Sequence, residues 1–126
     1  PEDVFILGSP EVIGMILELV LFKSPPGMDR AAIVEDARHT VPHWRANPDL
    51  VRKHYLLSED GYGGGAYIWP SREAARQGHD ATWREGVKKR TGSEPVICYF
   101  DLLMVVDNEK GSVTEWTEGG DARPVP

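Results

Sequence analysis

The chain has 126 residues, of which 40% are hydrophobic and 27% are charged, and its formal net charge is −6. This length suffices for one domain with a single core, and the acidic balance argues against a nucleic-acid or anionic-membrane partner. One cysteine, Cys98, excludes an internal disulfide and fits a reducing compartment, so we expect a cytoplasmic protein. No apolar run approaches the roughly 20 residues of a membrane span.

The first 14 residues differ in character from those that follow. A short apolar run at residues 4–7 lies between a polar start and a Gly-Ser-Pro break. Met15 opens the first segment with a clear pattern, so we expect residues 1–14 to be a leader or an N-terminal extension. In the alternative, residues 4–7 add a short strand to a sheet edge.

Residues 12–22 form an almost wholly apolar run, and two prolines follow at 25 and 26. Such a run fits either a buried helix or a strand that is covered on both faces. Because prolines directly after a helix would leave its end uncapped, we expect a central strand. Its one charge, Glu18, then shares a face with Ile16 and Val20, where a carboxylate is costly unless it is paired or lines a cavity.

A helix is expected over residues 29–39. Asp29 suits the N-cap position, and Ala31 and Ala32 favour helix in the first turn. Pro42 is expected to end this helix, since proline lacks the backbone N–H that a helix interior needs. Trp44 then lies in the connection to the next strand.

Residues 50–57 and 66–69 are predicted to be two strands of a hairpin. Asp60-Gly61 between them is a strong turn signal, because both residues tolerate a positive φ. Tyr67 and Trp69 lie two apart and so point to one face of their strand. Tyr55 lies on the partner strand and can share that face.

Ser71 is the expected N-cap of a second helical region, which Gly78 interrupts and Asp80 caps again. Gly92 ends the region. Residues 96–106 are predicted to be a last buried strand that contains Asp101. Residues 109–126 are expected to be a polar tail, either mobile or crossing to a partner.

The order strand, helix, strand, strand, helix, strand is that of a ferredoxin-like α+β domain, which we place at residues 15–108. Helices would cover one face of a four-stranded antiparallel sheet. The first and last strands are apolar on both faces, and no element remains for the second face. Two copies packed sheet to sheet would bury it, so we expect a homodimer that forms a dimeric α/β barrel.

Several segments resemble the dimeric α/β-barrel superfamily, and within it the small YdhR-type proteins related to antibiotic-biosynthesis monooxygenases. The resemblance rests on LVRKHYL at 50–56, GGGAYIW at 63–69 and SREAA at 71–75, with GSEPV at 92–96 and YFD at 99–101. It covers residues 15–108. The asparagine, tryptophan and histidine set of the anthrone-type relatives has no match at a comparable spacing.

The resemblance implies a cofactor-independent monooxygenase that oxidises a small aromatic or polyketide-like compound with O2. Such chemistry needs an apolar pocket, a base or hydrogen-bond donor, and protection from water. The expected substrate-binding residues are Tyr55, Tyr67, Trp69, Trp83, Tyr99, His39 and Trp44. The same superfamily suggests two alternatives: a non-catalytic small-molecule-binding or stress-related dimer, and an isomerase or decarboxylase.

Four histidines, at 39, 43, 54 and 79, are candidate bases because their ordinary pKa suits acid–base work near neutral pH. His54 is the preferred catalytic base if its strand face lines the barrel. His39 and His43 have the spacing of a metal pair, but Pro42 lies between them, so we expect no metal and no cofactor. Glu18 and Asp101 could form a carboxylate pair, although pairing of each with an arginine such as Arg52 or Arg45 is favoured.

Overall fold

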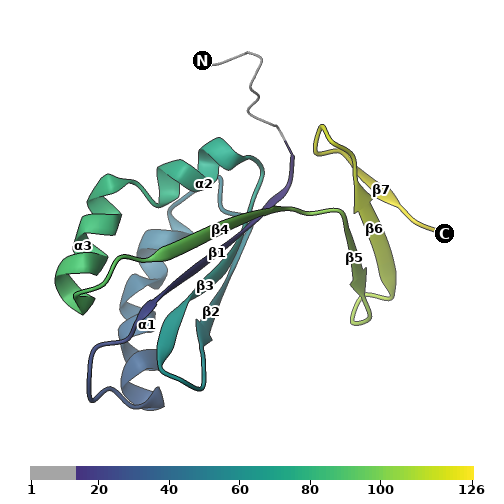
Figure 1. Cartoon of the computed structure of the whole chain (residues 1–126). Helices are drawn as coiled ribbons and strands as arrows, with labels where there is room; N and C mark the ends of the chain where they lie inside the picture. Colours follow the sequence, from purple (N-terminus) through teal and green to yellow (C-terminus); the bar gives the residue numbers. More distant parts are fainter. Residues whose placement is uncertain (1–13) are drawn as a thin grey trace.

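Strand β1 (Ile16–Lys23) is the centre of the sheet in the computed structural model, which describes residues 14–126 (Figure 1). The antiparallel sheet has the order β2-β3-β1-β4. The other strands are β2 (Arg52–Leu57), β3 (Tyr62–Trp69) and β4 (Val96–Asp101). Helices α1 (Arg30–Arg45), α2 (Arg72–Gly78) and α3 (Ala81–Thr91) lie on one face. This arrangement confirms the predicted ferredoxin-like α+β fold. The predictions for residues 1–13 lie outside the described residues.

The core lies between the helices and one face of the sheet, where alternate residues of β1 point inward. Ile16, Glu18 and Val20 are fully buried, while the residues between them are only half-buried. In the β1–β3 register, Ile16 pairs with Trp69 and Glu18 with Tyr67. The predicted strand is confirmed from Ile16 onward, and so is the face on which its single carboxylate lies.

The glycines at 63–65 belong to β3, although the sequence analysis began this strand only at residue 66. Gly61 forms the turn, with φ +87°, and the strand starts directly after it at Tyr62. Gly64 has φ +146°, and a Cβ there would collide with the Val20 carbonyl oxygen on β1. The glycine run therefore lets β3 approach β1 closely. The sequence analysis instead assigned these glycines to the hairpin turn.

Helix α1 continues through Pro42, so the prediction that this proline ends the helix is wrong. A proline removes only one backbone hydrogen bond, and the Ala46 N–H still donates to the Pro42 carbonyl at 3.1 Å. The extra turn carries Trp44, which is buried in the core. Burial of a large aromatic side chain offsets the lost hydrogen bond.

The expected last strand over residues 96–106 is two strands in two sheets. β4 ends at Asp101, and β5 (Met104–Asp107) pairs with β6 (Ser112–Trp116), which in turn pairs with β7 (Ala122–Pro124). The expected polar tail therefore provides two strands of a second sheet, set apart from the helices in Figure 1. The turn signal missed in the sequence is Asp107, whose carboxylate accepts from the Lys110 N–H, followed by Gly111 at φ +69°.

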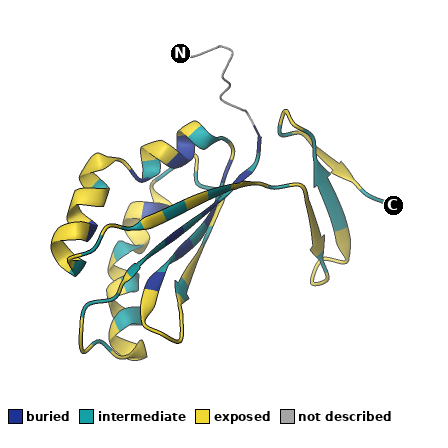
Figure 2. Ribbon diagram, viewed as in Figure 1, coloured by how far each residue is buried: buried dark blue, intermediate teal, exposed yellow. Residues whose placement is uncertain are grey.

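The face of the main sheet that points away from the helices has no cover among residues 14–126 (Figure 2). Val96 and Phe100 on β4 are 58% and 51% exposed, and Leu17, Leu19 and Leu21 on β1 are half-buried. On β5, Met104 and Val106 are also exposed. Within the described residues, none of the helices is long and apolar enough to span a membrane.

Candidate functional site

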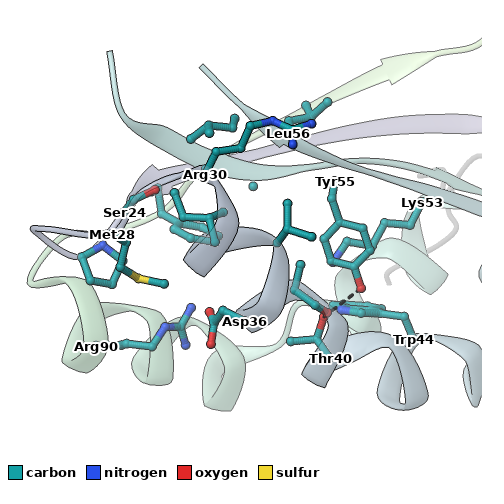
Figure 3. A pocket seen from close by; sticks show the side chains of 18 of the residues that line it. Ser24, Met28, Arg30, Asp36, Thr40, Trp44, Lys53, Tyr55, Leu56 and Arg90 are labelled. Carbon is teal, nitrogen blue, oxygen red and sulfur yellow. Dashed lines mark hydrogen bonds between the residues drawn. The ribbon is translucent and has the colours of Figure 1, made fainter. Parts of the chain in front are cut away.

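A pocket of about 330 Å³ opens between α1 and the helix-facing side of the sheet (Figure 3). Its walls come from β1, α1, β2, β3 and α3, so no single segment of the sequence defines it. The aromatic residues that line it are Phe22, Trp44, Tyr55, Tyr67 and Trp83. Such a largely apolar cleft with a few polar groups suits a small organic ligand.

The amine of Lys53 lies inside a cage of three aromatic rings in this pocket. Its Nζ is 3.9 Å from the ring centroid of Tyr55, 4.4 Å from that of Trp44 and 4.7 Å from that of Tyr67. Strand alternation explains why Lys53 and Tyr55 share the helix-facing side of β2. Gly65 on β3 leaves room for the cage, because a Cβ there would lie 3.1 Å from Lys53 Cε and 2.9 Å from Tyr67 Cε1.

Burial lowers the pKa of Lys53 to about 7. A partly desolvated amine favours its neutral form, whereas the faces of aromatic rings attract the ammonium ion. The two influences oppose each other, so both protonation states of Lys53 are accessible near neutral pH.

Other polar groups surround the cage. The Tyr55 hydroxyl and Thr40 Oγ1 are 2.8 Å apart and hydrogen-bonded, which fixes the Tyr55 ring against α1 (Figure 3). Burial, reinforced by the charge of Glu18, raises the pKa of Tyr67 far above its usual value, so this residue stays a neutral phenol. The charged residues that line the pocket besides Lys53 are Arg30, Asp36 and Arg90.

A second polar centre lies beneath the pocket walls. Glu18 Oε1 accepts hydrogen bonds from Trp69 Nε1 at 2.8 Å and from His79 Nδ1 at 2.9 Å, and all three side chains are buried. The His79 ring contacts the pocket-lining rings of Trp83 and Tyr67, with centroids 4.4 and 4.5 Å away. Through these contacts, the hydrogen-bonded Glu18–His79 pair holds the rings of Tyr67 and Trp83 in position on the side away from the pocket.

Four of the expected substrate-binding residues line the pocket: Tyr55, Tyr67, Trp83 and Trp44. Trp69 does not, because its indole is buried against Glu18. Tyr99, half-buried on β4, lies under Arg72, whose guanidinium carbon is 5.5 Å from the ring centroid. Burial, together with the charge of Glu18, raises the pKa of Tyr99.

The two expected histidines lie outside the pocket. His39 is exposed on α1, where its Nε2 is 3.2 Å from Glu35 Oε2. His54 is exposed on β2 and, by strand alternation, points to the face opposite Lys53. That face would be covered in the expected dimer, so His54 as the base stays a prediction that depends on a partner subunit.

Sequence reasoning gave Lys53 no role. It named His79 only as one of four candidate bases, without its hydrogen bond to Glu18. Lys53 could have been found, because alternation from Tyr55 places it on the same face of β2. His79 is hydrogen-bonded to Glu18, which lies 61 positions earlier in the chain. A local sequence pattern could not have paired these two residues. The pairing of Glu18 with an arginine is wrong, and Asp101 is exposed opposite Ile16 in the register.

Among residues 14–126, no group of three or more histidine, cysteine, aspartate or glutamate side chains could hold a metal ion. The arrangement instead offers an apolar cavity, one amine and a hydrogen-bonded tyrosine hydroxyl. Such a set can bind an aromatic molecule that carries an acidic hydroxyl and can exchange a proton with it.

Three solved structures share the fold of this chain. A Nitrosomonas europaea protein of unknown function, NE2512, has a TM-score of 0.60 at 15% identity, over 75% of this chain and 95% of that one. The monooxygenase from the gene ActVA-Orf6 of Streptomyces coelicolor, solved with the ligand nanaomycin D, has a TM-score of 0.55 at 22% identity, over 75% and 92%. A Caulobacter crescentus protein proposed to be an antibiotic biosynthesis monooxygenase has a TM-score of 0.51 at 19% identity, over 77% and 94%.

Neither the models of protein families nor the curated proteins give a match to the sequence. The structural likeness therefore defines the class of fold: a ferredoxin-like α+β domain of the kind found in antibiotic-biosynthesis monooxygenases. At the level of the fold, the resemblance identified from the residues is confirmed. The YdhR type stays a prediction.

Proposed function

We propose that the protein is a cofactor-independent monooxygenase that oxidises a small aromatic or polyketide-like compound with O2. The observation that carries the proposal is the ring-walled pocket with a single amine held among three aromatic faces. The fold is compatible with this activity, since a monooxygenase of the same fold was solved with the ligand nanaomycin D.

In such an oxidation a ring CH2 group becomes a carbonyl group, one oxygen atom of O2 enters the product, and the other leaves as water. The substrate supplies all the electrons, so the balance requires no external reductant. The protein must promote loss of a proton from the substrate, because the anion transfers an electron to O2 more readily than the neutral compound. It must also shield the intermediates from water.

The pocket side chains fit these tasks. Trp44 and Tyr67 supply flat apolar walls against which an aromatic ring can pack. The hydroxyl of Tyr55, held by Thr40, can donate or accept a hydrogen bond at the substrate. The amine of Lys53 adds a group that can carry a proton near neutral pH.

The assembly that we propose is a homodimer joined through the open face of the main sheet. The exposed Val96 and Phe100, with the half-buried leucines of β1, form an apolar surface without cover among the described residues. An apolar surface of this kind is typical of an interface between subunits.

Oxygen uptake by chelator-treated protein would test the activity, with anthrones and hydroxynaphthalenes as substrates and chromatography to follow the product. Ala37 lines the pocket, so Ala37→Phe should fill the cavity and abolish uptake. Ala31 is exposed on the same helix, and Ala31→Phe should leave uptake unchanged. Both variants need unaltered circular dichroism for the comparison to count.

Other outcomes would favour the alternatives. Saturable binding of these compounds without any turnover would favour a non-catalytic binding protein. Turnover without oxygen consumption would favour an isomerase or decarboxylase. Equal uptake by the Ala37→Phe protein would contradict this pocket as the site.

A further inference from the structure

The amine of Lys53 has no polar partner in the described part of the chain. It contacts the three aromatic rings, and within residues 14–126 it makes no ion pair and no hydrogen bond. A half-buried ammonium group without an anion is unfavourable, so it either loses its proton or gains an anion from a ligand. Since Lys53 lines the pocket, a bound molecule can supply that anion.

We propose that Lys53 takes the proton from an acidic aromatic or enolic hydroxyl of the ligand and then holds the resulting oxyanion as its counter-ion. This inference rests on the proposed function only in taking the pocket as the ligand site. It assigns the ligand class as phenols and enols acidic enough to ionise near neutral pH.

The proton transfer is balanced within the pair. The ligand O–H bond breaks, its electron pair stays on oxygen, and the lone pair of Nζ forms the new N–H bond. A neutral amine and a neutral hydroxyl become an ammonium–oxyanion pair, so the net charge of the site is unchanged. The surrounding rings stabilise the ammonium form, and the burial that lowers the pKa of Lys53 keeps the free amine available before the ligand binds.

Several titratable and charged groups lie near Lys53 in the pocket. Tyr67 is kept neutral by burial, and the Tyr55 hydroxyl is engaged by Thr40. On the helices, Arg30, Asp36 and Arg90 line the same pocket. An arginine stays protonated and cannot act as the base, but it could bind the anion instead, so Arg90 is a rival that the experiment must include.

The test uses 4-nitrophenol, whose phenolate form absorbs visible light whereas the phenol form does not. Titration of the probe across neutral pH with excess protein reports which form is bound. With the wild-type protein we expect phenolate to persist at a pH at which the free probe is mainly phenol. Lys53→Met should weaken binding of the phenolate about 10- to 100-fold, because a charge-assisted contact is lost.

Matched variants separate the explanations. Lys89 is exposed on α3, and Lys89→Met should bind the probe as the wild type does. Lys53→Arg should retain phenolate binding, because it keeps the cation, but should lose oxygen uptake, because guanidinium cannot accept the proton. Lys53→Gln serves as a second neutral variant if Lys53→Met fails to fold.

Failure of this inference can be told from failure of the proposed function. Phenolate binding that depends on Lys53 supports the inference even if none of the substrates consumes O2. The inference is overturned if Lys53→Met binds phenolate normally, if Arg90→Met or His54→Ala removes the binding instead, or if the wild-type protein does not bind the probe. If Lys53→Met both binds phenolate normally and consumes oxygen normally, the inference is overturned while the proposed function stays in place.

Discussion

At the scale of single residues, the buried carboxylate of Glu18 is the most informative group in the core. It accepts hydrogen bonds from Trp69 and His79, and its position on β1 puts it directly behind the pocket-wall rings. A fully buried acid is tolerated here because it accepts hydrogen bonds from two donors that are themselves buried. The Glu18 network therefore stabilises the wall of the site rather than its interior.

We expect Glu18→Gln to lower the free energy of unfolding by about 1–3 kcal/mol, measured by urea denaturation. Glutamine keeps one accepting oxygen but replaces the other with an NH2 group, and it removes the charge that strengthens both hydrogen bonds. Glu35 is exposed on α1, so Glu35→Gln should lower the free energy of unfolding much less than Glu18→Gln does. Equal effects of the two changes would contradict the network.

Two glycines in helices offer a matched pair of substitutions with opposite expected signs. At Gly78 a Cβ would lie 2.5 Å from Cη2 of the fully buried Trp69, whereas at Gly86 it would meet nothing within 4 Å. Gly78→Ala should therefore destabilise the protein by about 1–3 kcal/mol through overpacking. Gly86→Ala should stabilise it by up to about 1 kcal/mol through helix propensity. Thermal and urea unfolding of both variants would reveal the signs.

The pKa of Lys53 also predicts how stability depends on pH. It is about 7 in the folded protein, against 10.5 for an ordinary lysine. Between these values the unfolded chain binds more protons than the folded one, so the free energy of unfolding rises with pH. The cost of burying Lys53 is complete below pH 7 and disappears above pH 10.5.

Lys53→Met removes this titration. The variant should therefore be more stable than the wild type below pH 7, and the difference should shrink as the pH rises towards 10.5. Urea unfolding at several pH values would measure it, with the exposed Lys89→Met as the control. A constant difference across this range would show that Lys53 titrates normally.

At the scale of elements, the junction between α2 and α3 positions two aromatic side chains of the site. Asp80 caps α3 by accepting from the Trp83 N–H at 2.9 Å, and His79 immediately precedes it. The cap thus sets where the ring of Trp83 meets the ring of His79, 4.4 Å away between centroids.

Asp80→Ala should cost about 1 kcal/mol of stability and shift the indole N–H resonance of Trp83 in an NMR spectrum. Asp80→Ser keeps a capping oxygen and should restore both. Asp29→Ala is the control. It removes the N-cap of α1, where the Asp29 carboxylate accepts a hydrogen bond from the Ala32 N–H at 2.9 Å. The Asp29→Ala variant should lower the free energy of unfolding by a similar amount but should leave the indole N–H resonance of Trp83 unshifted.

Local signals explain why much of the fold could be predicted. The N-caps Asp29, Ser71 and Asp80, the turn at Gly61 and the helix end at Gly92 each depend on a few neighbouring residues. From these and the apolar runs, the order of strands and helices follows.

The wrong predictions concern contacts between distant segments. Pro42 continues the helix because Trp44 packs on a sheet that is formed elsewhere in the chain. β5 leaves the main sheet because a hairpin partner, β6, follows it. In the same way, alternation could suggest the aromatic walls, but the cage around Lys53 joins α1, β2 and β3 and needed the three-dimensional structure.

At the scale of the whole molecule, the two faces of the main sheet differ. One face packs on three helices, and the other is open (Figure 2). Leu19 lies near the middle of the open face, between Ala66 on β3 and Cys98 on β4 in the register. Its half-buried side chain is thus surrounded by other residues of the same apolar surface.

The proposed homodimer should therefore depend on this face. Leu19→Asp would place a charge in the middle of an apolar interface, where it would lack a partner, and should convert the dimer to a monomer in analytical ultracentrifugation. Val41 is 37% exposed on α1, away from the open face, so Val41→Asp should remain dimeric. A wild-type protein that sediments with the mass of one chain would refute the dimer. The apolar face would then require a different explanation. His54 would also be unsuitable as the base, because it points to that face and is shielded from water only if a second subunit covers the face.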